Sequence, residues 1–314
     1  MAADRISRRW CLGLLTIIGL LTGCAGLTSR WPVSDPELPP RRVLTGVDFI
    51  AQDEYQCGPA ALAMGLGWSG LAVSPQELTP MVYTASRRGS LQPAMIAAAR
   101  RWGRVAYVIK GPEALLDEVA AGHPVIVLQN LGFSWAPLWH YAVVIGYDRP
   151  ADEVVLHTGL SAGRRTDWAL FLNTWSRGGE WGLLVLNPEE LPVTAGEGSF
   201  LEAVIGLEHA GRFDEAARAY RTALARWPGS LGALMGLGNS EVARGDLGKA
   251  AAAFREAAAA HPQSGAAWNN LAHVLMKQGR KEEALDAAQR AVALGGPQSA
   301  TFRQTLEEIG NASP

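Results

Sequence analysis

The sequence predicts an α+β domain followed by an all-α helical repeat region. In the first half, a short helical pattern precedes several runs rich in Val, Ile and Leu, which is the order of a helix packed on an antiparallel sheet. After a linker over residues 191–198, the composition changes abruptly to Ala-rich segments with a helical period. A glycine-led motif then recurs every 34 residues, as in stacked helix pairs. The 314 residues leave room for two such domains.

The first 23 residues have the composition of a bacterial signal peptide. Basic residues precede an apolar stretch over residues 10–22, which is shorter than the roughly 20 residues of a membrane-spanning helix. The stretch ends in LTGC at residues 21–24, which resembles a lipoprotein processing signal. The resemblance implies cleavage before Cys24 and lipid attachment to its sulfur, whereas the alternative is an ordinary signal peptide with a chance cysteine. Ala25, and not Asp, follows the predicted lipidated cysteine, which resembles the signal for transfer to the outer membrane in Gram-negative bacteria. We therefore expect a lipid-anchored protein of the outer membrane that faces the periplasm.

Between the predicted anchor and the linker, the sequence divides into a tether and a folded domain. Residues 24–42 contain four prolines and read as an extended tether. Residues 43–190 form the α+β domain. Its helical patterns cover residues 57–68, 90–102, 112–121 and 167–176, and its strand patterns cover residues 104–109, 124–129, 139–147, 153–157 and 181–186.

Residues 199–314 carry the repeated motif. The glycines that lead it, the small residues on the following helix, and the prolines between helices all keep the 34-residue spacing: Gly211, Gly245 and Gly279; Ala216, Ala250 and Ala284; Pro228 and Pro262. The pattern resembles the tetratricopeptide repeat, a helix-turn-helix unit. The resemblance implies about three repeats, a polar capping helix at residues 299–309, and a groove that binds a protein partner or a substrate segment.

Charge and cysteine usage narrow the function. A net charge of −2 gives no electrostatic reason to expect nucleic acid as a partner. We expect no cofactor and no metal, because the histidines show no metal-ligand spacing. Of the three cysteines, Cys11 is lost with the signal peptide and Cys24 is assigned to the lipid. Cys57 remains as an unpaired thiol in an oxidising compartment, which indicates reactivity.

The surroundings of Cys57 are those of a nucleophile. It lies in QDEYQCGPAAL at residues 52–62, and Pro59 favours a helix that starts beside the cysteine. Unpaired N–H groups at a helix start lower a thiol pKa. His140 heads a later strand in WHYAVVIGYD at residues 139–148, and a distant Cys and His can meet in the fold. The alternative for Cys57 is a buried small apolar residue.

Together the two motifs resemble the bacteriocin-processing (double-glycine leader) cysteine peptidases, which are papain-like. The resemblance covers about residues 43–190. It implies that Cys57 is the nucleophile, that His140 is its general base, and that the Gln52 side-chain amide and the Cys57 backbone N–H bind the oxyanion. Gln52 lies five residues before the cysteine, whereas six is commoner in the family, and Gln56 is the alternative.

The third catalytic residue departs from the family pattern. The family usually has an Asp or Asn on the strand after the histidine strand, in an Asp-Pro pair, and counting across the turn leads here to His157 and Thr158. His157 is therefore the candidate orienting residue: a neutral imidazole accepts a hydrogen bond but lacks the negative charge of a carboxylate. The site then works as a Cys-His pair, or another residue takes the role, or activity is weakened.

These observations support three hypotheses. The first is a periplasmic cysteine peptidase that cleaves a peptide or protein through a Cys57 thioester, with the repeats as a binding module. The second is an inactive or weak peptidase fold that acts as a scaffold through its repeats. The third is acyl transfer to an amine, which shares the thioester. The family relatives are often fused to an exporter, and no such segment is evident here, so their substrate is not carried over.

Overall fold

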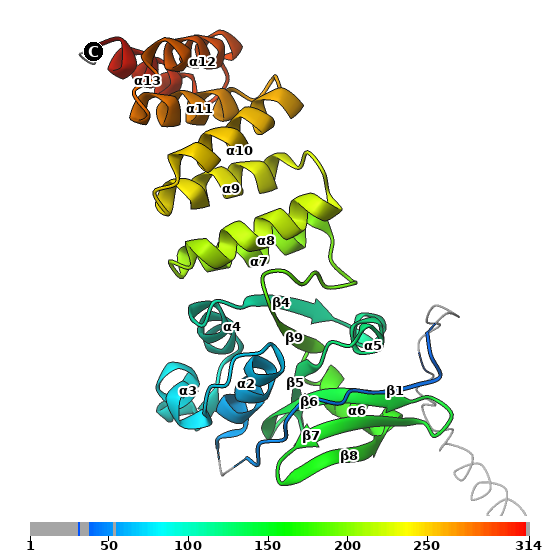
Figure 1. The fold of residues 1–314 in the computed structure, drawn as a ribbon. Coiled ribbons are helices and arrows are strands. Elements are labelled where there is room, and N and C mark those ends of the chain that lie inside the picture. The colour runs from blue at the N-terminus through cyan, green and yellow to red at the C-terminus, as the bar shows by residue number, and fades with distance from the viewer. Residues whose placement is uncertain (1–30, 32–37, 53–54, 312–314) are drawn as a thin grey trace, which may run out of the picture.

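The computed structural model describes residue 31 and residues 38–52 and 55–311. In this part of the chain, a sheet domain is followed by a stack of helices (Figure 1). The predicted signal peptide, Cys24 and most of the predicted tether lie outside the described residues. Among those described, no helix is long and apolar enough to cross a membrane.

The sheet domain alternates short helices with antiparallel strands. Its elements are β1 (Arg41–Val43), α2 (Cys57–Trp68), α3 (Pro75–Val82), β2 (Tyr83–Thr84), η1 (Ala85–Arg87), β3 (Gly89–Ser90), α4 (Gln92–Arg101), β4 (Val105–Lys110), α5 (Pro112–Ala121), β5 (Val125–Asn130), β6 (Trp139–Asp148), β7 (Glu153–Thr158), β8 (Ser161–Asp167), α6 (Trp168–Ser176) and β9 (Trp181–Leu186).

The main sheet has the strand order β4-β9-β5-β6-β7-β8, and β1 adds to it by pairing with β6. Every described pairing in it is antiparallel. The five predicted strands and four predicted helices are present with small differences at their ends. The sequence analysis missed β8, because its exposed SAGRRTD sequence lacks an apolar run, and α3, although Ser74 and Glu77 form its capping box.

Helices cover both faces of this sheet, and the alternation along β6 shows how. Tyr141, Val143 and Ile145 pack in one core with apolar residues of α2, α3 and α4. Ala142 and Val144 pack in the other core, with residues of α5 and α6. Successive strand residues point to opposite faces, so one strand supplies both cores. The predicted α+β class is confirmed.

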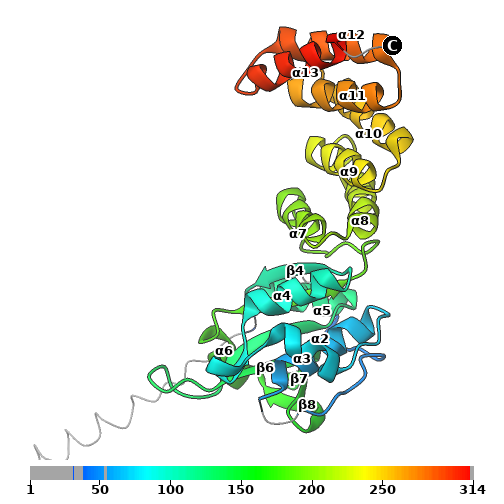
Figure 2. The same cartoon turned by 90° about the vertical axis from the view of Figure 1, so that its left-hand side faces the viewer.

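The helical region contains seven helices within the described residues: α7 (Glu197–His209), α8 (Phe213–Arg226), α9 (Leu231–Ala243), α10 (Leu247–Ala260), α11 (Gly265–Lys277), α12 (Lys281–Leu294) and α13 (Ser299–Asn311). They rise from the sheet domain as a stack of antiparallel helices (Figures 1 and 2).

The 34-residue period is visible in the helix starts, since α8, α10 and α12 begin at residues 213, 247 and 281. Gly211, Gly245 and Gly279 have φ values of 71°, 81° and 75°, in the left-handed region that ends each first helix. The alanines predicted to allow close packing (Ala216, Ala250 and Ala284) have no exposed surface. The predicted repeat organisation is confirmed.

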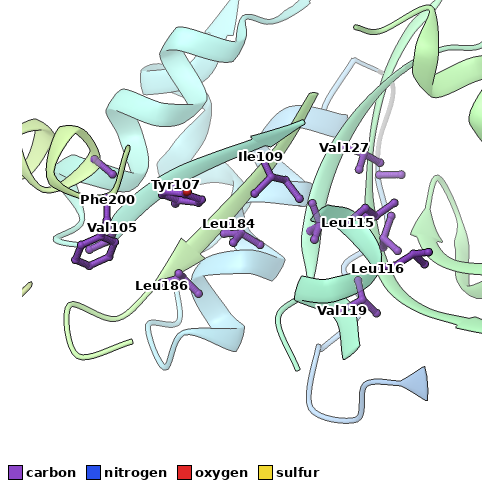
Figure 3. Close-up of a cluster of buried hydrophobic side chains, with 14 of the residues drawn as sticks. Val105, Tyr107, Ile109, Leu115, Leu116, Val119, Val127, Leu184, Leu186 and Phe200 are labelled. Atoms are coloured by element: carbon purple, nitrogen blue, oxygen red, sulfur yellow. The ribbon is translucent and has the colours of Figure 1, made fainter. Parts of the chain in front are cut away.

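The two parts of the chain share a hydrophobic core. Phe200, Val204 and Leu207 of α7 belong to the same cluster of buried side chains as Val105 and Leu186 of the sheet. Figure 3 shows Phe200 next to Val105 at the start of β4. The linker is also tied down: the backbone N–H of Thr194 donates to the Glu118 side chain of α5 over 2.8 Å.

The end of the predicted tether packs against the sheet domain. Strand β1 starts at Arg41, inside the segment that we assigned to the tether. Farther upstream, the Trp31 ring stacks on Trp168 at 4.0 Å between centroids, and its Nε1 donates to Asp152 over 2.6 Å. The apolar Trp31 ring thus finds a partner on the domain surface.

Candidate active site

Cys57 is the first residue of α2, as the sequence predicted. Its thiol is partly buried and unpaired, and it packs against the core on the α2 face of the sheet. The next residue must be glycine here, because a Cβ on Gly58 would lie 2.2 Å from the Ser90 Oγ. Ser90 precedes α4, so this close approach holds the segment before α4 against the start of α2.

Burial raises the pKa of the Cys57 thiol, while backbone hydrogen bonding from Tyr141, Gly58 and Cys57 itself opposes the shift. Cys57 also affects the Tyr141 side chain, since the pKa of the Tyr141 hydroxyl is raised by burial and, in addition, by the charge of Cys57. Tyr141 is the neighbour of His140 on β6. The fold therefore brings the thiol to the residue next to the predicted general base.

His140 lies near the start of β6 and bonds a residue of the next strand. Its Nε2 is 2.7 Å from the hydroxyl Oγ1 of Thr158, the last residue of β7. Burial lowers the pKa of the His140 imidazole, and the positive charge of Arg164 lowers it further. Thr158 thus takes the position of the orienting residue, without a negative charge.

The prediction that His157 orients His140 is wrong. The Nδ1 of His157 accepts from the Gly163 backbone N–H at 3.0 Å, so its Nε2 carries the proton that Val47 O accepts at 2.9 Å. Both ring nitrogens are engaged elsewhere. The physical reason is the alternation of a strand: Thr158 reaches His140, so its neighbour His157 points to the opposite face.

Gln52 reaches the site, and Gln56 turns away from it. The Gln52 side-chain amide donates to Tyr141 O over 3.3 Å, and its Oε1 accepts from the Gly159 N–H at 3.1 Å. One amide proton then remains for an oxyanion. Gln56 accepts instead from the hydroxyl of Thr79 in α3 at 2.8 Å. Of the two glutamines, Gln52 is the one that lies with Tyr141.

The turn between β7 and β8 is where the predicted residues converge. Gln52 binds Gly159 through both its side chain and its backbone N–H, His140 bonds Thr158, and His157 holds Gly163. The sequence analysis missed Thr158 as the residue that faces His140, although it lay in the right dipeptide. It also missed Arg164, because nothing in an isolated Arg-Arg pair points to a histidine far away in the sequence.

An exposed apolar loop leads into His140. In residues 131–138, which join β5 to β6, Trp135 is 82% exposed and stacks on Phe133. Leu131, Leu138 and Trp139 are also exposed. The loop is ordered by Asn130, whose Oδ1 accepts from the N–H groups of Gly132 and Leu138 at 3.0 and 2.9 Å. Exposed aromatic side chains next to the predicted general base are typical of a binding surface.

The repeats carry a hollow of their own. A cavity of about 360 Å³ lies among α9, α10, α11 and α13, and its lining includes Asn239, Asn270, His273 and Glu308. Asn270 donates to Asn239 across neighbouring repeats at 3.5 Å. Among the described residues, no cluster of His, Cys, Asp and Glu has the arrangement of a metal site.

The fold and this site are those of a sheet domain that resembles the C39 peptidases, followed by tetratricopeptide-like helices. Comparison with known families agrees. Residues 44–180 match the model of the Peptidase_C39 like family, and residues 201–264 and 236–299 match the tetratricopeptide repeat. No curated protein matches the chain.

Solved structures resemble the two parts separately. The peptidase domain of Streptococcus ComA, a bifunctional ABC transporter involved in quorum sensing, has 24% identity and a TM-score of 0.39, with 45% of this chain and 98% of that chain covered. The Yersinia enterocolitica type III secretion translocator chaperone SycD has 18% identity and a TM-score of 0.34, with coverages of 36% and 82%. MamA has 27% identity and a TM-score of 0.31, with coverages of 32% and 59%.

Proposed function

We propose that this protein is a lipid-anchored periplasmic cysteine peptidase that cleaves a peptide or protein through a Cys57 thioester. The observation that carries the proposal is the Cys57 thiol at the start of α2, in contact with Tyr141, whose neighbour His140 is held by Thr158. The match of this domain to the C39-like family supports it.

In the first step, the Cys57 Sγ attacks the carbonyl carbon of the scissile peptide bond. As the C–S bond forms, the thiol proton passes to His140, and the carbonyl oxygen becomes an oxyanion that the Cys57 N–H and the Gln52 amide receive. The C–N bond then breaks, and His140 returns the proton to the leaving amine. The product of this step is a thioester on Cys57.

In the second step, water attacks the thioester carbonyl while His140 takes a proton from the water. The C–S bond breaks, the sulfur regains the proton, and the acid product leaves. For this cycle the Nε2 of His140 must carry a proton, so that Nδ1 holds the free electron pair. Thr158 accepts from Nε2–H in that tautomer, but its hydroxyl also donates, so it stabilises the other tautomer as well.

The resting state is a neutral pair. A raised thiol pKa keeps Cys57 protonated at neutral pH, and a lowered imidazole pKa keeps His140 neutral. Both shifts oppose the thiolate-imidazolium ion pair, and part of the His140 shift comes from the charge of Arg164. This observation favours a second candidate function, a weak or inactive peptidase fold that serves as a scaffold for partners of the repeats.

The repeat region is proposed to hold the substrate or a protein partner. Its support is the cavity among α9, α10, α11 and α13, with asparagines from successive repeats facing it. The exposed apolar loop over residues 131–138 is proposed as the wall of the substrate cleft next to His140.

The alkylation rate of Cys57 as a function of pH tests the pair. With iodoacetamide on the full chain, we expect a slow rate at pH 7 that rises through the alkaline range, because the thiolate forms only above the raised pKa. We expect His140→Ala to lower the rate about tenfold at pH 7 and to leave it unchanged well above the thiol pKa, where no base is needed. Mass spectrometry of the Cys57 peptide separates it from other thiols.

Hydrolysis is then scored on a proteome-derived peptide library, with new termini identified by mass spectrometry. Cleavages that vanish in both Cys57→Ala and His140→Ala support the peptidase. A wild-type digest identical to that of Cys57→Ala, with alkylation indifferent to His140, would leave the scaffold as the function.

The anchor has its own test. We expect Cys24→Ser to move the protein from the membrane fraction to the soluble periplasmic fraction, because lipid attachment needs the Cys24 sulfur. Labelling with a palmitate analogue should mark the wild type and not the variant. An unlabelled wild type that stays membrane-bound in both forms would refute the lipid anchor.

A further inference from the structure

Arg164 is a charged side chain of the site that the catalytic cycle does not use. It lies on β8, at the outer edge of the sheet as described, and its side chain is exposed. Within the described residues it forms no ion pair, whereas its neighbour Arg165 pairs with Glu153 at 2.8 Å and with Asp148 at 3.6 Å. Adjacent residues on a strand point to opposite faces, so Arg164 and Arg165 lie on opposite faces of the sheet.

The register of β7 and β8 puts Arg164 on the side of His140. Arg164 is paired with Leu156, and Leu156 is two residues before Thr158 on β7, so Arg164 and Thr158 share a face. Thr158 is the residue that bonds His140. Two residues along a strand span about 7 Å, which is within reach of an arginine side chain.

The backbone around Arg164 is held in place by residues of the site. Gly163, the preceding residue, has a φ of 60° and donates its N–H to the buried His157. A bulge between Leu156 and Thr158 accommodates this glycine. His157, which does not orient His140, therefore positions the backbone that carries Arg164.

From this placement we propose that Arg164 is a specificity-determining residue that binds a carboxylate of the substrate beside the scissile bond. The proposal rests on the proposed peptidase function, but the experiments that test it measure alkylation of Cys57 and need no peptide cleavage. An exposed guanidinium next to a neutral hydroxyl and a neutral imidazole presents a positive charge with no anion of its own, and a guanidinium matches the fork of a carboxylate. A bound carboxylate also offsets the charge that opposes the imidazolium form of His140.

Two alkylating agents test the proposal without any turnover. Iodoacetate carries a carboxylate and iodoacetamide does not, and both react at the Cys57 sulfur. We expect the rate constant for iodoacetate divided by that for iodoacetamide to fall about three- to tenfold in Arg164→Gln and to fall further in Arg164→Glu. At high salt, the ratios of the variants and of the wild type should become equal. The matched control is Arg165→Gln, whose ratio should equal that of the wild type.

Protection experiments separate the two sources of a carboxylate. Short peptides are compared that carry a glutamate side chain with an amidated end, a glutamine with a free carboxyl end, or a glutamine with an amidated end. Each is scored for slowing the iodoacetamide reaction of the wild type and of Arg164→Gln. An acidic side chain or a free C-terminus is identified by whichever peptide protects only when Arg164 is present.

The outcomes distinguish this proposal from the peptidase function. A rate ratio that ignores Arg164 overturns the carboxylate site, whatever the digests of the peptide library show. A ratio that depends on Arg164 in a protein without Cys57-dependent cleavage upholds the site and refutes the peptidase.

Discussion

Thr158→Asp is expected to raise both the neutral-pH alkylation rate of Cys57 and any peptide cleavage that depends on it. A carboxylate only accepts hydrogen bonds, so it selects the tautomer of His140 with a proton on Nε2 and a free pair on Nδ1. It also supplies the negative charge that stabilises the imidazolium and offsets Arg164. In serine triads, removing this charge costs about ten-thousand-fold in kcat, so the gain in cleavage can approach that size.

Thr158→Asn is the matched control. An amide in this position accepts from Nε2–H without contributing charge, so the two variants separate orientation from electrostatics. We expect the alkylation rate at pH 7 to rise about ten- to a hundredfold with Asp and only a fewfold with Asn. Equal rates in all three proteins would mean that Thr158 does not govern His140.

Glu118→Ala is expected to destabilise the junction of the two domains by about 3–5 kcal/mol, the cost of breaking a buried charged network. The Glu118 side chain is fully buried on α5. It accepts from the backbone N–H and the hydroxyl of Thr194, at 2.8 and 2.6 Å, and it bonds the Nδ1 of His123 at 2.5 Å. Removing the carboxylate leaves these groups buried without their partner.

Urea unfolding of the full chain, followed by circular dichroism, measures this loss as a lower midpoint at an unchanged slope. Glu118→Gln keeps the shape and one acceptor, so its midpoint should fall between those of the wild type and the alanine variant. A free energy of unfolding for Glu118→Ala within about 0.5 kcal/mol of the wild type would contradict a role of Glu118 in stability.

The sequence predicts most of this fold because the strong patterns are local. Each run of Val, Ile and Leu predicts one central strand. The 34-residue spacing of Gly211, Gly245 and Gly279 predicts where the first helix of each repeat ends. Strand β8 could not be found in this way, because it is an exposed edge strand whose place is set by pairing with β7. Whether the two domains pack was equally hidden, since Phe200 meets Val105 only in the folded chain.

The sequence predicted the positions of Cys57 and His140 in the fold, but not which residue bonds His140 or which charge lies near it. Cys57 and His140 stand in motifs whose neighbours indicate their position in helix and strand. The choice between His157 and Thr158 depends on which of them faces His140. That is set by the register of β7 against β6, which shifts between Val144 and Gly146 in a way that the sequence does not reveal. Arg164 reaches the site only through the pairing of β8 with β7.

Because α7 and the sheet share a hydrophobic core, the repeats are attached to the sheet domain rigidly and not through a flexible linker. Under the proposed function, a segment bound by the repeats would be held by helices that share a hydrophobic core with the strand of His140, so its distance from the site would be fixed. A flexible linker would lower the effective concentration of a bound chain at the site, whereas a rigid connection would present one particular segment of that chain to the site. If the proposed peptidase function holds, the distance between the repeats and the site would act as a molecular ruler that selects which bond is cleaved.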